Sequence, residues 1–309
     1  MIKKIKIGDI TLENNLFVAP LAGFTDFAFR EVCLSLGAGL VYTEMVSAKA
    51  LSYHNLKTQE LLTGSYDKTC AQIFGNEPQV LRWACESEYL APFKIIDINM
   101  GCPAPKIYSN GEGSALLNDM GLASKIISEC AKSGKTITVK TRLGVTEKNP
   151  VILDFAKMCA DSGAKAITIH ARSKTAVYSG ECNYELVAKV KEKIDIPVII
   201  NGGIFSKADF EKAMNLSGAD GAMLARGVLE NPTIICDILG TSAPSVKSLL
   251  FRQLDMLNNL YAGDYIAVRM RKAIAYYLKR VRGSKEAKLK IFKESSVEEI
   301  KNILKDLDF

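Results

Sequence analysis

Eight short apolar runs recur along the chain, and segments with helical spacing separate them. Successive runs start 23 to 41 residues apart, about the length of one strand and one crossover helix. Strands that are apolar along their whole length are buried on both faces, as in a parallel sheet covered by helices. The sequence therefore predicts an α/β fold, a (β/α)8 TIM barrel, with strands at residues 16–20, 39–43, 69–74, 95–100, 136–141, 166–170, 196–201 and 220–225.

The repeating barrel pattern stops near Gly240, and the residues after it are helical in character. Before that point, five segments between the apolar runs have the amphipathic spacing of outer helices, namely 26–36, 77–90, 122–132, 151–162 and 208–215. Residues 4–13, with Gly8-Asp9 at their centre, predict a hairpin that closes the barrel bottom. Residues 240–245 are typical of a linker. We therefore expect a barrel domain over 1–240 and a small all-helical domain over 245–309.

The charge of the chain is concentrated in this second part. The net charge is +6, and residues 244–309 hold 14 basic and 8 acidic residues, so the remainder is neutral. A helix over about 267–281 would place an apolar seam on one face and basic residues on another. The seam is Met270, Ile274, Tyr277 and Val281, and the other face is Arg269, Lys272, Tyr276, Lys279 and Arg280. Such a stripe is typical of a surface that binds a polyanion, although a solvated helix face explains the charge alone equally well.

The composition of the chain argues against a disordered protein, a membrane protein and a metal-binding protein. Hydrophobic residues make up 48% of the chain, which excludes an intrinsically disordered protein. No apolar run reaches the roughly eighteen residues of a membrane helix, so we expect a cytoplasmic protein without a membrane partner. The eight cysteines form no Cys-x-x-Cys pair and only two histidines accompany them, so we expect reduced thiols and no metal site.

Polar residues follow nearly every predicted strand, where the active site of a TIM barrel lies. Asn201-Gly202-Gly203 follows the seventh strand, and Ala225-Arg226 follows the eighth. Small residues at these two loops let backbone N–H groups approach an anion, and Arg226 adds a fork of donors. The glycines would also suit tight turns, but their occurrence in adjacent loops favours phosphate binding.

Lys140 ends the fifth strand and would face the mouth of the barrel. A buried ammonium is costly unless it meets an anion or an electron-rich ring. Lys140 could form a Schiff base, or it could lie beside a flavin ring and stabilise the negative charge of the reduced form. Gln72 and His170 at the same mouth favour the ring, although His170 alone could be an ordinary core histidine.

Cys102 differs from the other seven cysteines, which we interpret as small buried apolar residues. It lies in the loop after the fourth strand, between Gly101 and Pro103, which would present the thiol at the catalytic face. The following residues, 106–114, are polar and rich in glycine, as expected of a mobile lid.

The residues around Cys102 resemble a known family. Residues 96–107, Ile-Asp-Ile-Asn-Met-Gly-Cys-Pro-Ala-Pro-Lys-Ile, are similar to the signature of the tRNA-dihydrouridine synthases, and Gly-Ser-Ala-Leu-Leu at 113–117 is similar to its sequel. The resemblance spans nearly the whole chain, from 19–23 through 169–172 to 271–279, and is strongest to the bacterial B-type branch. Two departures are Ala225, where the family usually has glycine, and Thr233-Ile234, where an aromatic residue often follows the proline.

The resemblance implies an FMN-binding barrel followed by a helical tRNA-binding domain, without an obligatory protein partner. It implies FMN contacts at Pro20, Leu21, Ala22, Gln72, Lys140, His170, Asn201, Gly202, Gly203, Ala225 and Arg226. It implies reduction of the C5=C6 bond of a uridine in tRNA, with NADPH or NADH as reductant, and Cys102 as the acid that protonates C5. Asn99 would bind the base, Arg172 the uracil carbonyl or a phosphate, and Arg269, Arg271 and Lys272 the tRNA.

Three alternatives remain at this point. The first is a flavin barrel oxidoreductase for a free small molecule, such as a dihydroorotate dehydrogenase, which leaves the basic helical part unexplained. The second is a Schiff-base aldolase centred on Lys140. The third is an RNA-binding protein without catalytic activity, which the presence of both Cys102 and Lys140 disfavours.

Overall fold

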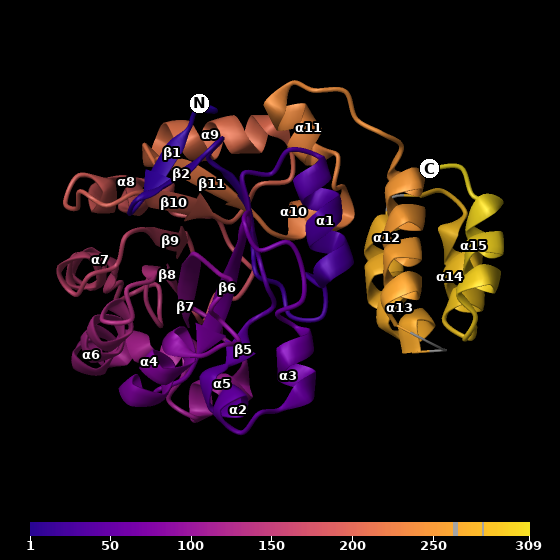
Figure 1. Ribbon diagram of the computed structural model, residues 1–309. Coiled ribbons are helices and arrows are strands. Elements are labelled where there is room, and N and C mark those ends of the chain that lie inside the picture. Colours follow the sequence, from indigo (N-terminus) through magenta and orange to yellow (C-terminus); the bar gives the residue numbers. More distant parts are fainter. Residues whose placement is uncertain (262–264, 280) are drawn as a thin grey trace.

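The computed structural model describes residues 1–261, 265–279 and 281–309. Its larger part is a closed parallel barrel with helices around it, and a group of helices lies beside the barrel (Figure 1). The predicted TIM barrel is confirmed. Its strands are β3 (Leu16–Val18), β4 (Leu40–Tyr42), β6 (Thr69–Phe74), β7 (Ile95–Met100), β8 (Thr136–Arg142), β9 (Ile167–His170), β10 (Val198–Asn201) and β11 (Gly221–Leu224).

Seven of the eight predicted runs contain one of these strands, and β8 extends one residue beyond the remaining run, 136–141. Neighbours pair in parallel in the order β4, β3, β11, β10, β9, β8, β7, β6, and the pairing of β4 with β6 closes the barrel. A two-residue strand, β5 (Val46–Ser47), also pairs with β6 and was not predicted, because two residues show no periodicity. The carboxyl ends of all eight barrel strands therefore open on one mouth.

The bottom of the barrel is closed by an antiparallel hairpin, as predicted. Its strands are β1 (Ile5–Ile7) and β2 (Ile10–Leu12). Ile5, Ile7 and Leu12 pack against apolar side chains inside the barrel, among them Phe17 and Leu40. The lower interior of the barrel is thus a packed core.

The outer ring buries a second core between the strands and the helices. The five predicted helices are confirmed as α1 (Phe27–Ser35), α4 (Pro78–Glu86), α6 (Met120–Ala131), α7 (Ile152–Asp161) and α9 (Lys207–Ser217). The remaining helices of this part are α2 (Ala48–Ser52), α3 (Leu56–Glu60), α5 (Pro105–Ser109), the 3₁₀ helix η1 (Gly113–Asn118), α8 (Tyr184–Lys191), α10 (Arg226–Glu230) and α11 (Ile234–Leu239).

The C-terminal region is helical, as predicted. It consists of α12 (Val246–Leu260), α13 (Tyr265–Tyr277), α14 (Ser284–Ile291) and α15 (Val297–Lys305), with α12 and α13 next to the barrel and the other two outside them (Figure 1). Met270, Ile274 and Tyr277 lie in its apolar core, as the predicted seam requires. The helix ends at Tyr277 instead of near 281, and Arg280 lies outside the described residues. The division into two domains at 240–245 stays a prediction.

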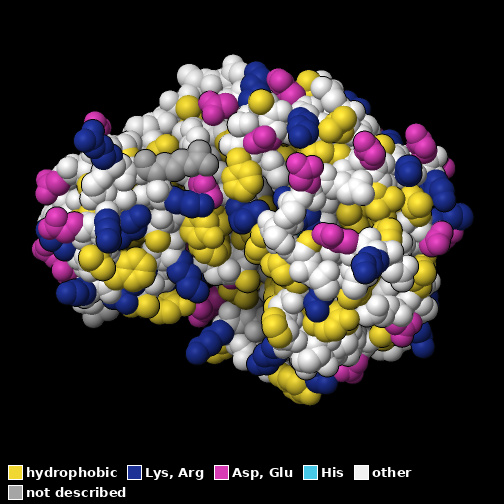
Figure 2. Space-filling view, turned by 180° about the vertical axis from the view of Figure 1, so that it is seen from behind, with side chains coloured by type: hydrophobic (Ala, Val, Ile, Leu, Met, Phe, Trp, Pro, Cys, Tyr) yellow, Lys and Arg dark blue, Asp and Glu magenta, His cyan; other side chains and the backbone are white. Residues whose placement is uncertain are grey.

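Seen from behind, the helical region and the barrel form two lobes with a groove between them (Figure 2). Apolar and basic side chains lie along the sides of this groove, with acidic ones among them (Figure 2).

Candidate active site

A cavity of about 290 Å³ lies at the mouth of the barrel, with Tyr276 of α13 in its wall. It brings together 14 of the 17 residues proposed from the sequence. These are Pro20, Leu21, Ala22, Gln72, Asn99, Cys102, Lys140, His170, Arg172, Asn201, Gly202, Gly203, Ala225 and Arg226. Arg269, Arg271 and Lys272 are not among its lining residues.

A chain of hydrogen bonds runs from the barrel interior to Cys102. The buried Asp97 carboxylate accepts from Gln72 Nε2 at 2.7 Å and from Thr138 Oγ1 at 2.6 Å. Gln72 Oε1 accepts from Asn99 Nδ2 at 2.9 Å, and Asn99 Oδ1 accepts from the backbone N–H of Cys102 at 2.9 Å. An ionised carboxylate only accepts, so it turns the Gln72 amino group toward itself and thereby orients both amides. Asp97 thus determines how the Cys102 loop is held.

The charge of Asp97 is costly where it lies. Burial raises the pKa of its carboxyl from 3.8 to about 6, against the lowering effect of the hydrogen bonds from Gln72 and Thr138. Lys140 is a more distant positive charge that also lowers this pKa. The carboxylate is therefore mostly ionised at neutral pH, and its two short hydrogen bonds oppose the cost of burial.

Lys140 projects from β8 into the cavity. Its Nζ donates to Asn201 Oδ1 at 3.0 Å, and Asn201 Nδ2 in turn donates to the backbone carbonyl of Met223 at 2.8 Å. Burial, and to a smaller extent the positive charge of Arg142, lowers the pKa of Lys140 from 10.5 to about 8. An ammonium has three protons and Asn201 takes one, so the others are available to a ligand in the cavity.

The loops after β10 and β11 form one end of the cavity. Gly202 and Gly203 adopt positive φ angles of +112° and +74°, and within the described residues their N–H groups donate to no protein acceptor. The guanidinium of Arg226 lies 4.3 Å from the ring centre of Tyr178 and 5.4 Å from that of Phe205. Free amides beside an oriented arginine form a donor set that suits a terminal phosphate, so the residues fit a monophosphate-bearing group such as FMN.

His170 and two arginines form the wall next to this end. Burial lowers the pKa of His170 well below 6.5, and nearby Arg142, Lys140, Arg172 and Arg226 add to the effect, so its ring is neutral. Arg172 Nη1 lies 3.4 Å from His170 Nε2. Because a guanidinium only donates, His170 Nε2 is the acceptor and its Nδ1 carries the proton.

Two arginines hold the loop after β9 beside the cavity by donating hydrogen bonds to its backbone carbonyls. Arg172 donates through Nε and Nη2 to the Gly180 carbonyl, both at 3.0 Å. Arg142 Nη1 donates to the carbonyls of Ser173 and Val177 at 2.9 and 3.0 Å. The loop thereby brings Tyr178 to the cavity wall.

Cys102 is half-buried and is one of the residues that line the cavity. Its carbonyl accepts from Ser114 N at 3.1 Å and from Ser114 Oγ at 2.8 Å. The segment expected to be a lid forms α5 and the start of η1, and these two bonds connect it to Cys102. Six of the other cysteines are buried as interpreted from the sequence, whereas Cys182 is half-buried beside Gly202 and Gly203.

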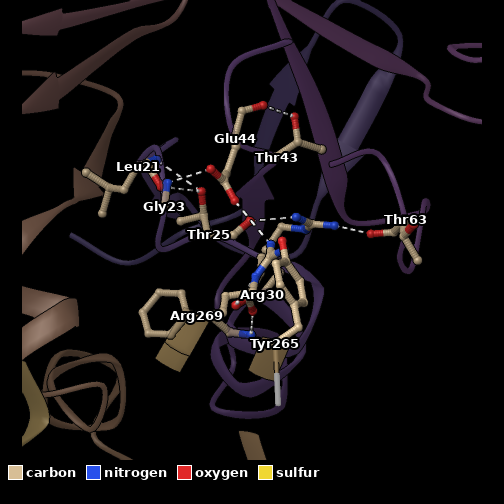
Figure 3. Close-up of polar contacts among 11 residues, drawn as sticks. Leu21, Gly23, Thr25, Arg30, Thr43, Glu44, Thr63, Tyr265 and Arg269 are labelled. Atoms are coloured by element: carbon tan, nitrogen blue, oxygen red, sulfur yellow. Dashed lines mark hydrogen bonds and ion pairs between the residues drawn. The ribbon is translucent and has the colours of Figure 1, made fainter. Parts of the chain in front are cut away.

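The three basic residues assigned to tRNA lie on α13 in different settings. Arg269 faces the barrel and pairs with Asp26 and Glu44 (Figure 3). Arg271 is half-buried and donates to the Glu294 carbonyl at 3.0 Å. Lys272 is exposed to solvent.

Sequence reasoning missed several residues of this cavity. Arg142 is a charged strand end, but the carbonyls it binds belong to the loops after β7 and β9. Asp97, which lies beneath the cavity lining, is an acid inside a mostly apolar strand, and its partners come from the two neighbouring strands. Tyr276 was placed on the basic face of its helix, whereas it lines the cavity and packs edge-on against Phe24 with ring centres 5.1 Å apart. Met45 and Tyr178 carried no signal that distinguished them from other loop residues.

Two classes of site are absent from the described part of the chain. No group of three potential His, Cys, Asp or Glu ligands could hold a metal ion among these residues. None of the described helices has the length and apolar character needed to cross a membrane.

The fold and the cavity together define a (β/α)8 barrel enzyme with a polar, cation-rich ligand site at the strand ends. Comparison with known proteins identifies it further. The chain belongs to the dihydrouridine synthase family, because residues 17–308 match the family described as dihydrouridine synthase (Dus). It is therefore an oxidoreductase, and family membership decides among the alternatives that the residues left open.

Curated relatives agree with the family assignment. A probable tRNA-dihydrouridine synthase of Rickettsia conorii is 36% identical over 287 residues, covering 88% of this chain and 87% of the relative. A tRNA-dihydrouridine synthase B of Pseudomonas putida is 34% identical over 296 residues, covering 91% and 88%.

Solved structures agree on the fold alone. A histamine dehydrogenase from Rhizobium sp. 4-9 has a TM-score of 0.60 at 13% identity, over 89% of this chain and 50% of that one. A variant of NCR from Zymomonas mobilis has a TM-score of 0.55 at 15% identity, over 80% of this chain and 94% of that one.

Proposed function

We propose that this dihydrouridine synthase acts on tRNA, reducing the C5=C6 bond of specific uridines to 5,6-dihydrouridine with FMN as cofactor and NADPH or NADH as reductant. The observation that carries the proposal is the cavity itself. One end has free glycine amides and Arg226, the middle has the Lys140 ammonium, and the Cys102 loop forms another wall. The names of the relatives from Rickettsia conorii and Pseudomonas putida support tRNA as the substrate.

The residues that would hold FMN are those proposed from the sequence. Gly202, Gly203 and Arg226 would bind its phosphate, with Asn201 and Ala225 beside them. Pro20, Leu21, Ala22, Gln72, Lys140 and His170 would contact the rest of the cofactor. When bound, the flavin supplies the hydride that adds to C6 of uracil.

The chain itself supplies the proton. Hydride addition at C6 leaves negative charge on C5 and the conjugated carbonyl, so C5 must accept a proton for the reduction to be complete. Cys102 would donate it, because a thiol can act as a general acid and this residue lines the cavity. The Asp97, Gln72 and Asn99 hydrogen bonds orient the backbone on which the thiol is carried.

Two further residues would position the base. Asn99 Nδ2 donates one of its protons to Gln72 Oε1. The other proton points to the Met45 sulfur, a weak acceptor 3.6 Å away. A uracil carbonyl would be a better acceptor at that position. Arg172, already oriented by the Gly180 carbonyl, would bind the uracil carbonyl or a neighbouring phosphate.

The tRNA would be held by the helical region and the groove beside it. A uridine inside folded RNA must leave its stack to enter a cavity at the barrel mouth, which requires a surface that binds the neighbouring phosphates. Lys272 is exposed for this purpose, and Arg271 lies beside it on α13. The proposal places the enzyme in the cytoplasm, where its RNA substrate is, and it requires no second protein.

The proposal is tested with the purified full chain. Heat-released cofactor should co-chromatograph with FMN and not with FAD. The FMN-loaded protein, given NADPH and an unmodified tRNA transcript, should form dihydrouridine that mass spectrometry detects, and a reaction without reductant should form none. Failure to bind FMN, or absence of dihydrouridine from every tRNA of a complete set, would overturn the proposal.

A further inference from the structure

Four charged side chains meet where α13 packs against the mouth of the barrel (Figure 3). Glu44 follows β4, Asp26 caps α1 by accepting from Phe29 N at 2.9 Å, and Arg30 lies within α1. Arg269 comes from α13 of the helical region, and only 18% of its side chain is exposed. Two acids face two bases, so the cluster is neutral as a whole and joins the two parts of the molecule.

Glu44 holds a loop that forms part of the cavity wall. The loop follows β3, and its residues Leu21, Ala22 and Phe24 line the cavity. Within the loop, Phe24 N and Thr25 N donate to the Leu21 carbonyl at 2.9 and 3.0 Å. The tip of the loop is Gly23, where φ is +79°. Its N–H donates to Oε2 of Glu44, which lies outside the loop. This hydrogen bond determines how far the tip lies from the strand end.

Arg269 reaches both acids from the other side. Its Nη2 lies 3.5 Å from Glu44 Oε1 and its Nε lies 3.7 Å from Asp26 Oδ2. Burial raises the pKa of Glu44, and the Gly23 N–H and Arg269 both oppose that rise. The guanidinium therefore favours the ionised form of Glu44, and an ionised carboxylate is the stronger acceptor for the Gly23 N–H.

Arg30 anchors the other side of the same loop. Its Nη1 donates to the Thr25 carbonyl at 2.6 Å, and its Nη2 donates to the Thr63 carbonyl. Arg30 thus holds the Thr25 end of this segment from within the barrel, and Arg269 of the helical region acts on its Gly23 tip through Glu44. Only Arg269 belongs to the part of the chain that is expected to bind RNA.

We propose that Arg269 and Glu44 are positioning residues for the cofactor, which fix the loop at Leu21–Phe24 so that the helical region sets how tightly the barrel binds FMN. The proposal rests on the proposed function, in which FMN occupies this cavity. It gives Arg269 a role other than contact with a tRNA phosphate, because two acids of the barrel already offset its charge.

The test measures FMN affinity of the full-length chain, stripped of cofactor and titrated by flavin fluorescence. Arg269→Met keeps the length of the side chain without its charge, and Glu44→Gln keeps an acceptor for Gly23 without the ion pair. Each should raise the Kd for FMN about tenfold, as for one charge-assisted hydrogen bond, and the double variant should be no weaker than either single one. Arg269→Lys should recover part of the affinity, because it restores the charge.

Arg252→Met is the matched control. Arg252 Nη1 donates to Ser35 Oγ at 2.9 Å, so it also joins the helical region to α1, but at the end away from the loop. Its FMN affinity should equal that of the wild type. If wild type binds FMN and Arg269→Met binds it equally well, or if Arg252→Met is weakened as much as Arg269→Met, the proposal is wrong. A wild type that binds no FMN would instead refute the proposed function.

Discussion

Asp97→Asn removes a buried charge and changes the shape of the side chain very little. The carboxylate is fully buried, and its accepted hydrogen bonds from Gln72 and Thr138 are 2.7 and 2.6 Å long. Burial raises its pKa from 3.8 to about 6 in the folded chain, whereas the unfolded chain exposes the group to water. Folding therefore weakens the acid, and the stability of the protein depends on pH through this residue.

The direction in which stability changes with pH depends on whether the folded or the unfolded chain releases the Asp97 proton at the lower pH. Between about pH 4 and pH 6 the unfolded chain is ionised at Asp97 while the folded chain still holds the proton, so stability is lost as pH rises through this window and is constant above it. A rise in pKa from 3.8 to about 6, at about 1.4 kcal/mol per pH unit, corresponds to about 3 kcal/mol. Asparagine carries no such proton. At pH 4 the unfolded chain is already partly ionised, so the free energy of unfolding of Asp97→Asn, relative to wild type, should rise by about 2 kcal/mol of this total between about pH 4 and about pH 7.

Urea unfolding followed by circular dichroism at the two pH values measures this difference, and other titrating groups cancel between the two proteins. Activity should move the other way, because an amide can present either its oxygen or its nitrogen to Gln72 and so no longer fixes the orientation of Asn99. Misplacement of the Cys102 loop could lower the rate up to about a hundredfold. An equal stability difference at both pH values would refute the reasoning about the buried charge, and full activity would refute the orienting role.

Three further predictions concern other parts of the site. Gly202→Ala would place a Cβ 2.6 Å from His170 Cδ2 at a φ of +112°, so the substitution should cost about 1–3 kcal/mol of stability and weaken FMN binding. Thermal unfolding measures the first effect and a fluorescence titration the second, and unchanged values would contradict the phosphate site. FMN affinity of the wild type should fall as pH rises through about 8, because Lys140 loses its charge there, and Lys140→Met should bind weakly with no such inflection. Lys272→Ala should weaken tRNA binding and lower the slope of log affinity against log salt by nearly one in filter-binding assays, and an unchanged slope would mean that Lys272 contacts no phosphate.

The barrel could be predicted because its signal is local. Strands β6 and β7 coincide with the predicted runs at 69–74 and 95–100, since each is a short, mostly apolar segment bounded by turn residues. The strand ends in turn predict which side chains share the cavity, because the carboxyl ends of parallel strands meet at one mouth. Gln72, Lys140 and His170 lie together for this reason.

The pairing of charges could not be predicted, because the partners are distant in sequence. Arg269 belongs to a basic stripe when α13 is considered alone, yet its acids come from the loops after β3 and β4. Asp97 gains its role from Gln72 and Thr138 on the two neighbouring strands. Tyr276 lines the cavity only because α13 packs against the barrel mouth, and helical periodicity says nothing about that contact.

The central claim is that the chain binds FMN and tRNA with one set of residues and delivers the proton with another, Cys102. The most direct test is a single turnover in which unmodified tRNA reoxidises the pre-reduced, FMN-loaded Cys102→Ala enzyme while dihydrouridine is counted. The account predicts normal FMN binding, normal reduction by NADPH and normal tRNA affinity, with dihydrouridine formation slowed by about a hundred- to ten-thousandfold. Reoxidation at the wild-type rate with a full yield of dihydrouridine would contradict it, because the proton would then come from another group.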